Sequence, residues 1–577
     1  MSHRVHLFSL RLAHAMRAVL SEGYTRAALV KDILAGCVVG IIAIPLAMAL
    51  AIASGVPPQY GLYSAIIAGF LVALTGGSRF SVSGPTAAFV VILHPLVTQH
   101  GMAGLLVASI MAGVILMLMA YARLGRFIEY IPETVTLGFT GGIGIVIATL
   151  QIPDFLGLQV ATLPEHYYEK IITIAQHLPS VDLSSLMVAS FTLVFMLLWP
   201  KLKVAVPAHL PAVILASILT IILNHYGSDV ATIGSRFHYL LADGSVGNGI
   251  PSVLPQFDWP WLRPGAGGES FSLNWPTIKD LIPAAFAIAM LGAIESLLCA
   301  VVLDGMSGKR HSANSELLGQ GIGNIVAPFF GGITSTAAIA RSAASLKAGA
   351  VSPVAAMVHA LVVLLALVML SGLLGYLPMP ALAALLLVVA WNMSEAPKSV
   401  RIVKAAPASD IAVFATCLTL TVWFDMVIAI SAGMLLASVL FVRQIAGMTK
   451  VVDITDNKKF VTEVPQGWKV FKIKGPLFFA AADRVFGEIN EQVKSLDGVI
   501  LTMESVPILD AGGLSALSKL MTAQCDAGVK VFMCEWQFQP LKTLAKAKLT
   551  PDGDIVRFFD SLENAEAAAK ASKLSRL

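Results

Sequence analysis

Two short segments interrupt the hydrophobic pattern of this chain and carry residues that could hold an anion. Residues 331–341 begin with two glycines, continue with small residues and end in an arginine among apolar neighbours. Residues 83–89 break an apolar region with Gly and Pro, and their Thr-Ala-Ala recurs 250 positions later in the first segment. Matching interruptions in two hydrophobic halves are typical of internally repeated transporters, whose substrate lies where broken helices meet.

The chemistry of such a site comes from helix N-termini. Their backbone N–H groups are unpaired and carry partial positive charge, so two half-helices that meet head to head form an anion site. We expect Thr86, Ala87 and Ala88 to begin one half-helix and residues 336–339 to begin the other. Small side chains would let a ligand approach the backbone. The alternative is that these residues only allow close helix packing, which is common in membranes.

Arg341 and Glu295 are charged residues within apolar runs. A charge at the centre of a membrane helix costs ~2.5–3.5 kcal/mol on insertion scales, so such residues need partners and are functional candidates by default. Arg341 would strengthen the field of the two helix ends; alternatively it extends to the cytoplasmic face, as Lys347 would. Glu295 could bind a coupling proton or cation, or could simply neutralise Arg341.

The composition indicates a polytopic membrane protein. Of the 577 residues, 56% are hydrophobic and 13% charged, whereas a soluble domain carries about 25% charged residues. The mean hydropathy is +0.79. The net charge is only +4 and the basic residues lie in short clusters, which argues against a nucleic-acid partner. The five cysteines lack metal-ligand spacing, and we expect free thiols, no metal and no cofactor.

About fourteen apolar segments follow one another from residue 30 to residue 443. The expected segments are 30–52, 60–76, 85–99, 103–122, 131–150, 184–200, 208–225, 278–303, 314–330, 336–349, 353–371, 380–393, 409–424 and 426–443. Those beginning near 85 and 336 are too short to cross a bilayer unaided, which favours half-helices whose unwound starts face protein or water.

The orientation follows from the basic residues, which are enriched in short cytoplasmic loops. With the N-terminus inside, the loops expected on the cytoplasmic side contain Arg79, Arg123, Arg126, Lys201, Lys203, Lys309, Arg310, Lys347, Lys398, Arg401, Lys404 and Arg443. The long 226–276 connection has few basic residues and is expected outside. Both termini are then cytoplasmic.

The last part of the chain has the pattern of a soluble α/β domain. Strands are predicted at 470–473, 498–502 and 529–533, and helices at 482–494, 512–525 and 541–547. We therefore expect three regions: a cytoplasmic segment at 1–29, a transmembrane transport domain at 30–445, and a linker with a cytoplasmic domain at 446–577.

With these residues laid out, the chain resembles the SulP anion permease family with a C-terminal STAS domain, and within that family the DauA-type C4-dicarboxylate transporters of Gram-negative bacteria. The resemblance rests on residues 40–49 (GIIAIPLAMA), 57–63 (PPQYGLY), 81–86 (SVSGPT), 291–299 (LGAIESLLC), 314–317 (NSEL), 328–341, 475–479 (GPLFF) and 506–513 (VPILDAGG).

The resemblance implies an α-helical membrane fold of about fourteen segments in two inverted repeats, with a core domain that moves like an elevator against a gate domain, and a homodimer. It selects as substrate-binding residues Ile44, Leu46, Thr86, Ala87, Ala337, Ala338, Ile339 and Arg341, and as coupling residues Glu295 and Cys299.

Two departures from the family's patterns carry information. Sodium-coupled bicarbonate members have an aspartate at the position of Glu295 and a threonine at that of Cys299, so this chain favours protons over sodium as the coupling ion. In STAS domains of anti-sigma-factor antagonists a phosphorylatable serine follows the conserved aspartate, whereas here Ala511 follows Asp510. Phosphorylation at that position is excluded, while docking of a cytoplasmic protein partner stays open.

The residues predict a secondary transporter, not an enzyme, and the resemblance implies that it imports C4-dicarboxylates such as succinate, fumarate or aspartate across the bacterial inner membrane with protons. Two alternatives remain: a bicarbonate or sulfate symporter of the same family, coupled to sodium or protons, and a membrane sensor or scaffold that acts through the STAS domain.

Overall fold

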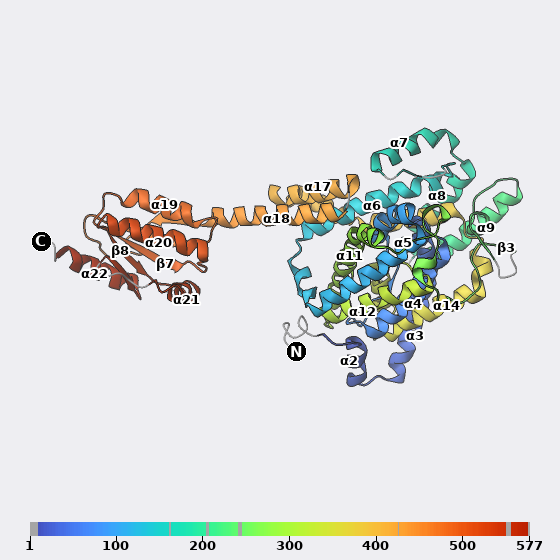
Figure 1. The fold of residues 1–577 in the computed structure, drawn as a ribbon, viewed down its shortest axis with the longest axis horizontal. Helices are drawn as coiled ribbons and strands as arrows, with labels where there is room; N and C mark the ends of the chain where they lie inside the picture. Colours follow the sequence, from blue (N-terminus) through green and yellow to red (C-terminus); the bar gives the residue numbers. More distant parts are fainter. Residues whose placement is uncertain are drawn as a thin grey trace. The chain divides into compact units, whose positions relative to one another are not determined.

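The computed structural model describes residues 10–160, 163–164, 166–202, 207–240, 245–424, 426–549 and 555–574. The chain divides into two compact units, Met1–Met434 and Leu435–Leu577, and each has its own hydrophobic core (Figure 1).

Long helices of the larger unit follow the predicted apolar segments closely. They are α3 (Arg26–Ala53), α4 (Pro58–Thr75), α5 (Ala87–Tyr121), α6 (Glu133–Leu156), α8 (Leu183–Leu198), α9 (His209–His225), α11 (Trp275–Ser307), α12 (Ala313–Val326), α13 (Ile339–Lys347), α14 (Val354–Leu374), α15 (Met379–Met393), α17 (Ala408–Trp423) and α18 (Met426–Met448), the last of which includes the boundary between the units. In the described part of the chain, nine helices are long and apolar enough to cross a membrane. The polytopic helical fold is confirmed.

Helix α5 contains the break that the sequence predicts between residues 99 and 103. Gly101 has φ 68° and ψ −167°, which interrupts the helical geometry. A Cβ atom at this position would lie 2.1 Å from the carbonyl carbon of Gly265, so only glycine fits. The two expected segments are therefore two helices joined by a kink.

Shorter elements in the connections were not predicted. They are α2 (His14–Glu22), α7 (Tyr167–His177), α10 (Ile233–Arg236), the hairpin β2 (His238–Leu240) with β3 (Val246–Asn248), and α16 (Ala396–Ala405). Several of these short elements are amphipathic and none is a continuous apolar run, so a search for membrane-spanning segments does not detect them.

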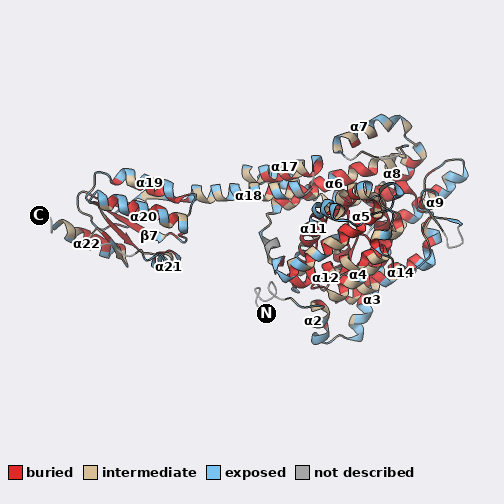
Figure 2. Cartoon of the chain, viewed as in Figure 1, coloured by how far each residue is buried: buried red, intermediate tan, exposed pale blue. Residues whose placement is uncertain are grey.

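The helices of the larger unit pack in two groups. In the first, α14 packs on α3 and α4, and α12 packs on α4 and α5, with α11 against α5. In the second, α15 and α17 pack on α6, and α8 joins α15 to α9. Buried residues, red in Figure 2, are frequent on α4 and α12 of the first group.

Small residues let the helices of the first group approach closely. A Cβ atom on Gly61 of α4 would lie 2.0 Å from the carbonyl oxygen of Ala47 on α3, so these two backbones are in contact. The packing interpretation of small residues, which the sequence left open, therefore holds here, away from the two interrupted segments.

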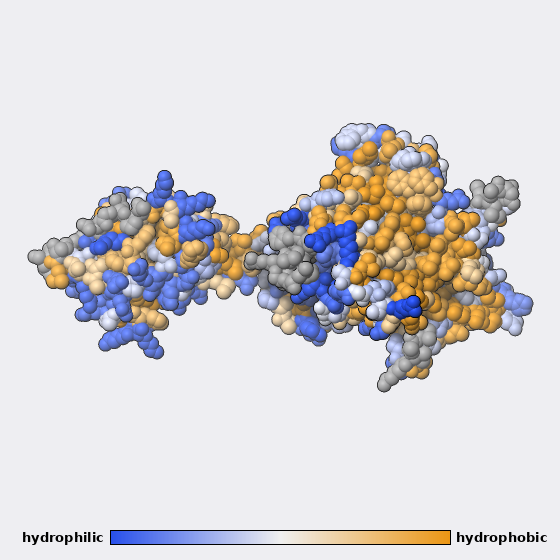
Figure 3. Space-filling view, turned by 90° about the horizontal axis from the view of Figure 1, so that it is seen from below, coloured by the Kyte–Doolittle hydropathy of each residue, from blue (hydrophilic) through white to orange (hydrophobic). Residues whose placement is uncertain are grey.

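Apolar residues, orange in Figure 3, cover much of the face of the larger unit that is seen there. Exposed examples include Leu118, Leu197, Phe286 and Met369. Soluble proteins rarely expose apolar surface on this scale, so this surface is suited to lipid.

The smaller unit is an α/β layer. Its five-stranded sheet has the order β5 (Lys450–Asp453), β6 (Trp468–Lys474), β7 (Gly498–Ser505), β8 (Lys530–Cys534) and β9 (Val556–Phe559). Only β5 is antiparallel to its neighbour. The helices are α19 (Ala482–Val493), α20 (Ala511–Asp526), α21 (Phe538–Lys546) and α22 (Leu562–Leu574). The three predicted strands and three predicted helices are confirmed; the short edge strands β5 and β9 and the Ala-rich α22 were not predicted.

Candidate anion-binding site

A two-stranded ribbon joins the two interrupted segments. In β1 (Ser83–Gly84) and β4 (Thr336–Ala337) the strands run antiparallel, with Gly84 opposite Thr336. The backbone N–H of Ala338 donates to the carbonyl oxygen of Val82 at 3.1 Å. The ribbon pairs backbone N–H and C=O groups that the two unwound segments would otherwise leave without partners. It also places the starts of α5 and α13 side by side.

The start of α13 differs from the prediction. The sequence analysis expects residues 336–339 to begin the second half-helix, but Thr336 and Ala337 are extended in β4, Ala338 is the N-cap, and α13 begins at Ile339. Cross-strand pairing with β1 holds the first two residues away from helical geometry. The paired half-helices exist, but the second starts three residues later than Thr336.

Thr86 joins the start of α5 to Glu295 on α11, which packs against α5 (Figure 1). Thr86 is the N-cap of α5, but its side chain makes no cap hydrogen bond; instead, its hydroxyl donates to Oε2 of Glu295 at 2.9 Å. Ala338, the N-cap of α13, has no side chain that could cap. Neither half-helix therefore uses a side-chain cap on its first N–H groups, which is the arrangement an anion site needs.

Arg341 reaches from the first turn of α13 to the other segment. Its guanidinium Nη2 donates to the carbonyl oxygen of Pro85 at 2.8 Å, and the residue is only 2% exposed. Its Nε and Nη1 are buried and have no hydrogen-bond partner in the described part of the chain. A Cβ atom on Gly84 would lie 2.8 Å from Nη1, so the guanidinium rests directly against that glycine.

These contacts decide between the interpretations that the sequence left open. A side chain that is 2% exposed does not extend to an interface, so that alternative for Arg341 is wrong. Among the described residues, no ion pair within 4.0 Å links Arg341 to a carboxylate, Glu295 included. Glu295 accepts a hydrogen bond from Thr86 and makes no close ion pair with the arginine, but the charges of Glu295 and Arg341 still interact, so the neutralising role stays open.

The other predicted site residues differ in how deeply they are buried and in what they pack against. Ile44 and Leu46 of α3 and Ala87 of α5 are buried members of one hydrophobic cluster. Ala338 is partly exposed, and Ile339 is exposed at 38%. Ala337 and Cys299 are fully buried and belong to a separate apolar cluster with Phe80. The structure thus joins Thr86 to Glu295 by a hydrogen bond, while Cys299 lies in apolar packing.

Polar residues that hold β4 in place escaped the sequence analysis. Asn324 of α12 binds the backbone of Ser335 with both amide atoms, each at 2.8 Å. Ser296, next to Glu295, forms a hydrogen bond with the hydroxyl of Thr336 at 2.6 Å. These contacts fix the unwound segment that precedes α13.

Helix α12 carries a polar stripe that the sequence shows in retrospect. Glu316, Gln320 and Asn324 recur every four residues, which puts them on one helix face. Gln320 Nε2 donates to the hydroxyl of Ser83 at 2.8 Å, and Glu316 Oε2 accepts from the backbone N–H of Gly77 at 2.9 Å. This stripe anchors both interrupted segments, and its spacing was the signal that could have revealed it.

The donors at the site suit an anion rather than a metal. Within the described residues, no cluster of three or more His, Cys, Asp or Glu side chains is arranged to hold a metal ion. The guanidinium of Arg341 and the N-termini of α5 and α13 come together at the site.

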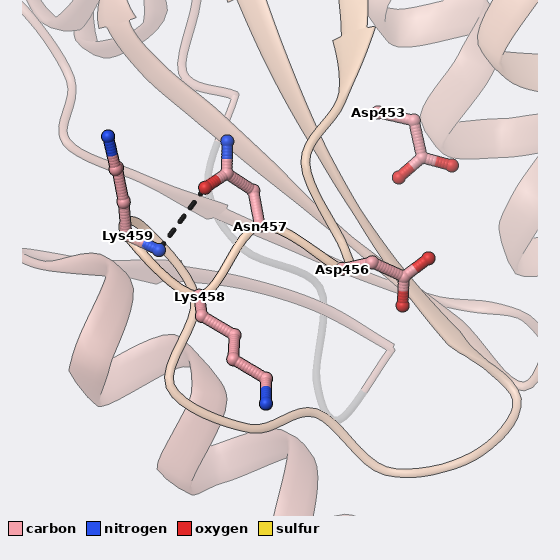
Figure 4. A pocket seen from close by; sticks show the side chains of 5 residues that line it. All are labelled: Asp453, Asp456, Asn457, Lys458 and Lys459. Carbon is pink, nitrogen blue, oxygen red and sulfur yellow. Dashed lines mark hydrogen bonds between the residues drawn. The ribbon is translucent and has the colours of Figure 1, made fainter.

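The smaller unit has an open surface hollow of about 730 Å³ beside β5 (Figure 4). It is lined by Asp453, Asp456, Asn457, Lys458 and Lys459, and Asn457 accepts a hydrogen bond from the backbone N–H of Lys459 at 3.2 Å. Burial would raise the pKa of Asp453, but hydrogen bonds from Thr455 and Lys469 outweigh it and hold that pKa below its ordinary value. The hollow mixes both charge signs and has the properties of a solvated turn.

Asp510 in the same unit has a structural role. Its carboxylate accepts from the N–H of Gly513 at 2.7 Å and of Phe479 at 3.2 Å, so it caps α20 and ties the loop after β6 to it. Ala511, the first residue of α20, offers no hydroxyl for a phosphate.

Comparison with known proteins identifies the family. The model of the sulfate permease family matches residues 29–417, and that of the STAS domain matches residues 459–565. The Bacillus subtilis protein named "Putative sulfate transporter YvdB" is 37% identical over 540 residues, which cover 93% of this chain and 97% of that protein. The bicarbonate transporter BicA of Picosynechococcus is 26% identical over 566 residues, with 92% and 94% covered.

Solved structures share the fold. The structure of SLC26A9 aligns with a TM-score of 0.79 at 19% identity, covering 97% of this chain and 93% of that one. The transmembrane domain of cyanobacterial BicA aligns with a TM-score of 0.59 at 25% identity, covering 72% and 98%. The family-model matches and the 37% identical relative show that the chain belongs to the sulfate permease family, as a multi-pass anion transporter with a C-terminal STAS domain.

Proposed function

We propose that this protein imports C4-dicarboxylates, such as succinate, fumarate and aspartate, together with protons. The observation that carries the proposal is the buried guanidinium of Arg341, which lies against Gly84 with Nε and Nη1 unpartnered in the described residues, beside the uncapped start of α5. One carboxylate of the substrate would bind there. We assign the carbon chain to Ile44 and Leu46, which are buried in the same hydrophobic cluster as Ala87.

We assign the substrate contacts to Thr86, Ala87, Ala337, Ala338 and Ile339 in addition to Arg341. The small side chains among them would let the anion approach the helix N-termini directly. Glu295 is the proposed proton carrier, with Cys299 one helical turn further along α11. Thr86 connects the two functions, since its hydroxyl bonds Glu295 while its backbone begins the helix that would bind substrate.

The membrane potential supports coupling to protons. A dianion that moves toward a negative interior faces ~2.3 kcal/mol per charge per 100 mV, and cotransported protons offset that cost. We further propose that the first group of helices moves as an elevator against the second. In this arrangement residues 30–445 form the transport domain in the inner membrane of a bacterium, as a dimer. The 1–29 segment and the 446–577 region, which includes the STAS domain, would both be cytoplasmic.

The second candidate is a sulfate or bicarbonate transporter, coupled to sodium or protons. It is favoured by the names of the relatives, among which are sulfate and bicarbonate transporters. A guanidinium and two helix N-termini suit sulfate as well, since its charge equals that of succinate. The apolar pair Ile44 and Leu46 favours the dicarboxylate, because sulfate has no carbon chain to bury.

Uptake by the purified protein in proteoliposomes separates these candidates. We expect labelled succinate to accumulate faster under an inward proton gradient than under an inward sodium gradient. Unlabelled fumarate and aspartate should compete, and sulfate and bicarbonate should compete weakly. Uptake of sulfate or bicarbonate but not of succinate would establish the second candidate, and succinate uptake that is indifferent to pH would contradict proton coupling.

A further inference from the structure

A short basic helix, α16, connects two apolar helices of the larger unit, α15 and α17. Its ten residues include three basic side chains and no acidic one. The helix follows Glu395, whose left-handed backbone (φ 42°, ψ 39°) turns the chain at the end of α15. At ~15 Å, α16 is too short to cross a bilayer about 30 Å thick. None of its residues is fully buried, so α16 is a surface helix between membrane helices.

The residues of α16 divide among three sides of the helix. Ser399 and Ile402, three positions apart, are half-buried on the side that packs, and α16 packs on α6 and α17. Val400 and Val403 form an apolar edge beside them, exposed at 52% and 50%. The remaining side is basic and exposed, and it carries Lys398, Arg401 and Lys404. An apolar edge next to a basic side is typical of helices that lie in the plane of the membrane interface.

The basic side keeps an excess of positive charge. Lys398 pairs with Glu395, so its charge is compensated within one turn. Within the part of the chain that the structure describes, neither Arg401 nor Lys404 forms an ion pair within 4.0 Å. Two cations beside an exposed apolar edge complement a lipid that has acyl chains and an anionic headgroup.

The end of α15 places α16 at the level of the headgroups. Trp391 of α15 is 63% exposed, and tryptophan at the end of a membrane helix is enriched at the interface. The hydroxyl of Ser394 donates to the carbonyl oxygen of Trp391 at 2.8 Å, and the hydroxyl of Ser399 donates to that of Ser394 at 3.3 Å. These two hydrogen bonds hold the first turn of α16 next to the end of α15.

We propose that α16 is a binding site for anionic phospholipid of the bilayer leaflet that it borders. Val400 and Val403 lie against acyl chains, and Arg401 and Lys404 bind the phosphate groups of the headgroups. The inference goes beyond the proposed function, because it concerns the lipid around the protein and holds whichever anion is transported.

Quenching by brominated lipids tests the proposal in vesicles that contain the full chain. Val403→Trp puts a fluorescent reporter on the apolar edge, and its signal is the difference from wild type. Brominated phosphatidylglycerol in plain phosphatidylcholine, compared with the reverse mixture at equal mole fraction, gives the binding constant of the anionic lipid relative to the zwitterionic one. We expect a ratio of about five at low salt and about one at 1 M salt, where the Debye length is ~3 Å.

Charge variants in the reporter background assign the effect to α16. Arg401→Gln combined with Lys404→Gln should lower the ratio to about one, whereas Arg401→Lys combined with Lys404→Arg should keep it within about twofold. The matched control is Lys542→Gln combined with Lys546→Gln, which removes two exposed lysines from α21 of the smaller unit. This control should leave the ratio unchanged.

Each other outcome would overturn the proposal. Equal quenching by the two lipids in the reporter variant would mean that α16 meets the bilayer without selecting charge. Quenching by neither lipid would mean that water or protein covers the apolar edge, and an equal loss in the α21 control would assign the effect to the net charge of the protein. If the glutamine pair does not fold, the 1 M salt measurement decides, and a ratio that stays near five there would contradict the proposal. Because no step uses transport, these results are independent of the proposed function.

Discussion

Thr86 donates its hydroxyl hydrogen to Glu295 across 2.9 Å, which links the N-cap of the broken helix α5 to the middle of α11. The bond removes Thr86 from its usual capping role and gives the carboxylate a partner other than Arg341. A change in the protonation of Glu295 would therefore alter the hydrogen bond of Thr86 at the start of α5, where the proposed substrate binds.

The first prediction concerns this acid. Glu295→Gln should abolish the acid-stimulated part of succinate uptake, because an amide keeps the shape but does not take up or release a proton near neutral pH. Asp280→Asn, which neutralises an exposed carboxylate on the same helix, should leave the pH dependence intact. Initial uptake rates at several external pH values measure both. Retained acid stimulation in Glu295→Gln would remove this residue from the coupling mechanism.

The second prediction isolates the hydroxyl of Thr86. Thr86→Val keeps the shape but leaves the carboxylate without its donor, and a hydrogen bond to a charged group is worth ~1.5–3 kcal/mol. We expect kcat/KM for uptake to fall roughly tenfold or more, whereas Thr86→Ser, which keeps the hydroxyl, should lose less than about threefold. Equal losses in the two variants would mean that the methyl group, and not the bond to Glu295, is what matters.

The third prediction uses the contact between Gly84 and Arg341. Gly84→Ala would place a Cβ atom 2.8 Å from Nη1, so the guanidinium must shift. We expect the KM for succinate to rise about tenfold, ~1.4 kcal/mol, with a folded protein. Gly292→Ala is a matched control on α11, because its Cβ would meet nothing nearer than 3.4 Å. Titration of uptake against substrate concentration tests both, and a normal KM in Gly84→Ala would contradict the placement of substrate at Arg341.

The fourth prediction separates transport from sensing. Arg341→Ala should abolish uptake while the protein stays folded, since the proposed site loses its only cation. Lys347→Ala, at the exposed end of the same helix, should retain uptake. Size-exclusion chromatography and thermal unfolding establish folding, and proteoliposome uptake establishes function. Uptake that survives in Arg341→Ala would exclude this arginine from the site and reopen the sensor or scaffold alternative.

The fifth prediction concerns the STAS domain. Burial raises the pKa of the Cys534 thiol to about 12, so at pH 8 it stays protonated and unreactive. Mass spectrometry after iodoacetamide treatment should find Cys534 unmodified in the native protein but modified after unfolding in guanidinium. Cys525 is only partly buried and should react first. Rapid native modification of Cys534 would show that β8 is open to solvent.

The membrane fold and the soluble α/β domain can both be predicted from the amino-acid sequence, because both follow from local hydrophobic patterning. The apolar runs predicted the membrane helices between α3 and α18 to within a few residues at most ends, but not the short connecting helices α7, α10 and α16, and alternation predicted the central strands β6 to β8. It also singled out Thr86, Glu295 and Arg341, since a charge or a break in an apolar run is visible without any knowledge of contacts.

Only the tertiary structure decided how these residues meet. The pairing of β1 with β4 delays the start of α13 to Ile339, and a cross-strand contact between residues more than 250 positions apart has no local signature. In the same way, sequence could not decide whether Glu295 bonds Thr86 or Arg341, because that choice depends on how α11 packs against α5 and the loop before α13. Patterning sets which residues are buried, and packing sets which buried polar groups become partners.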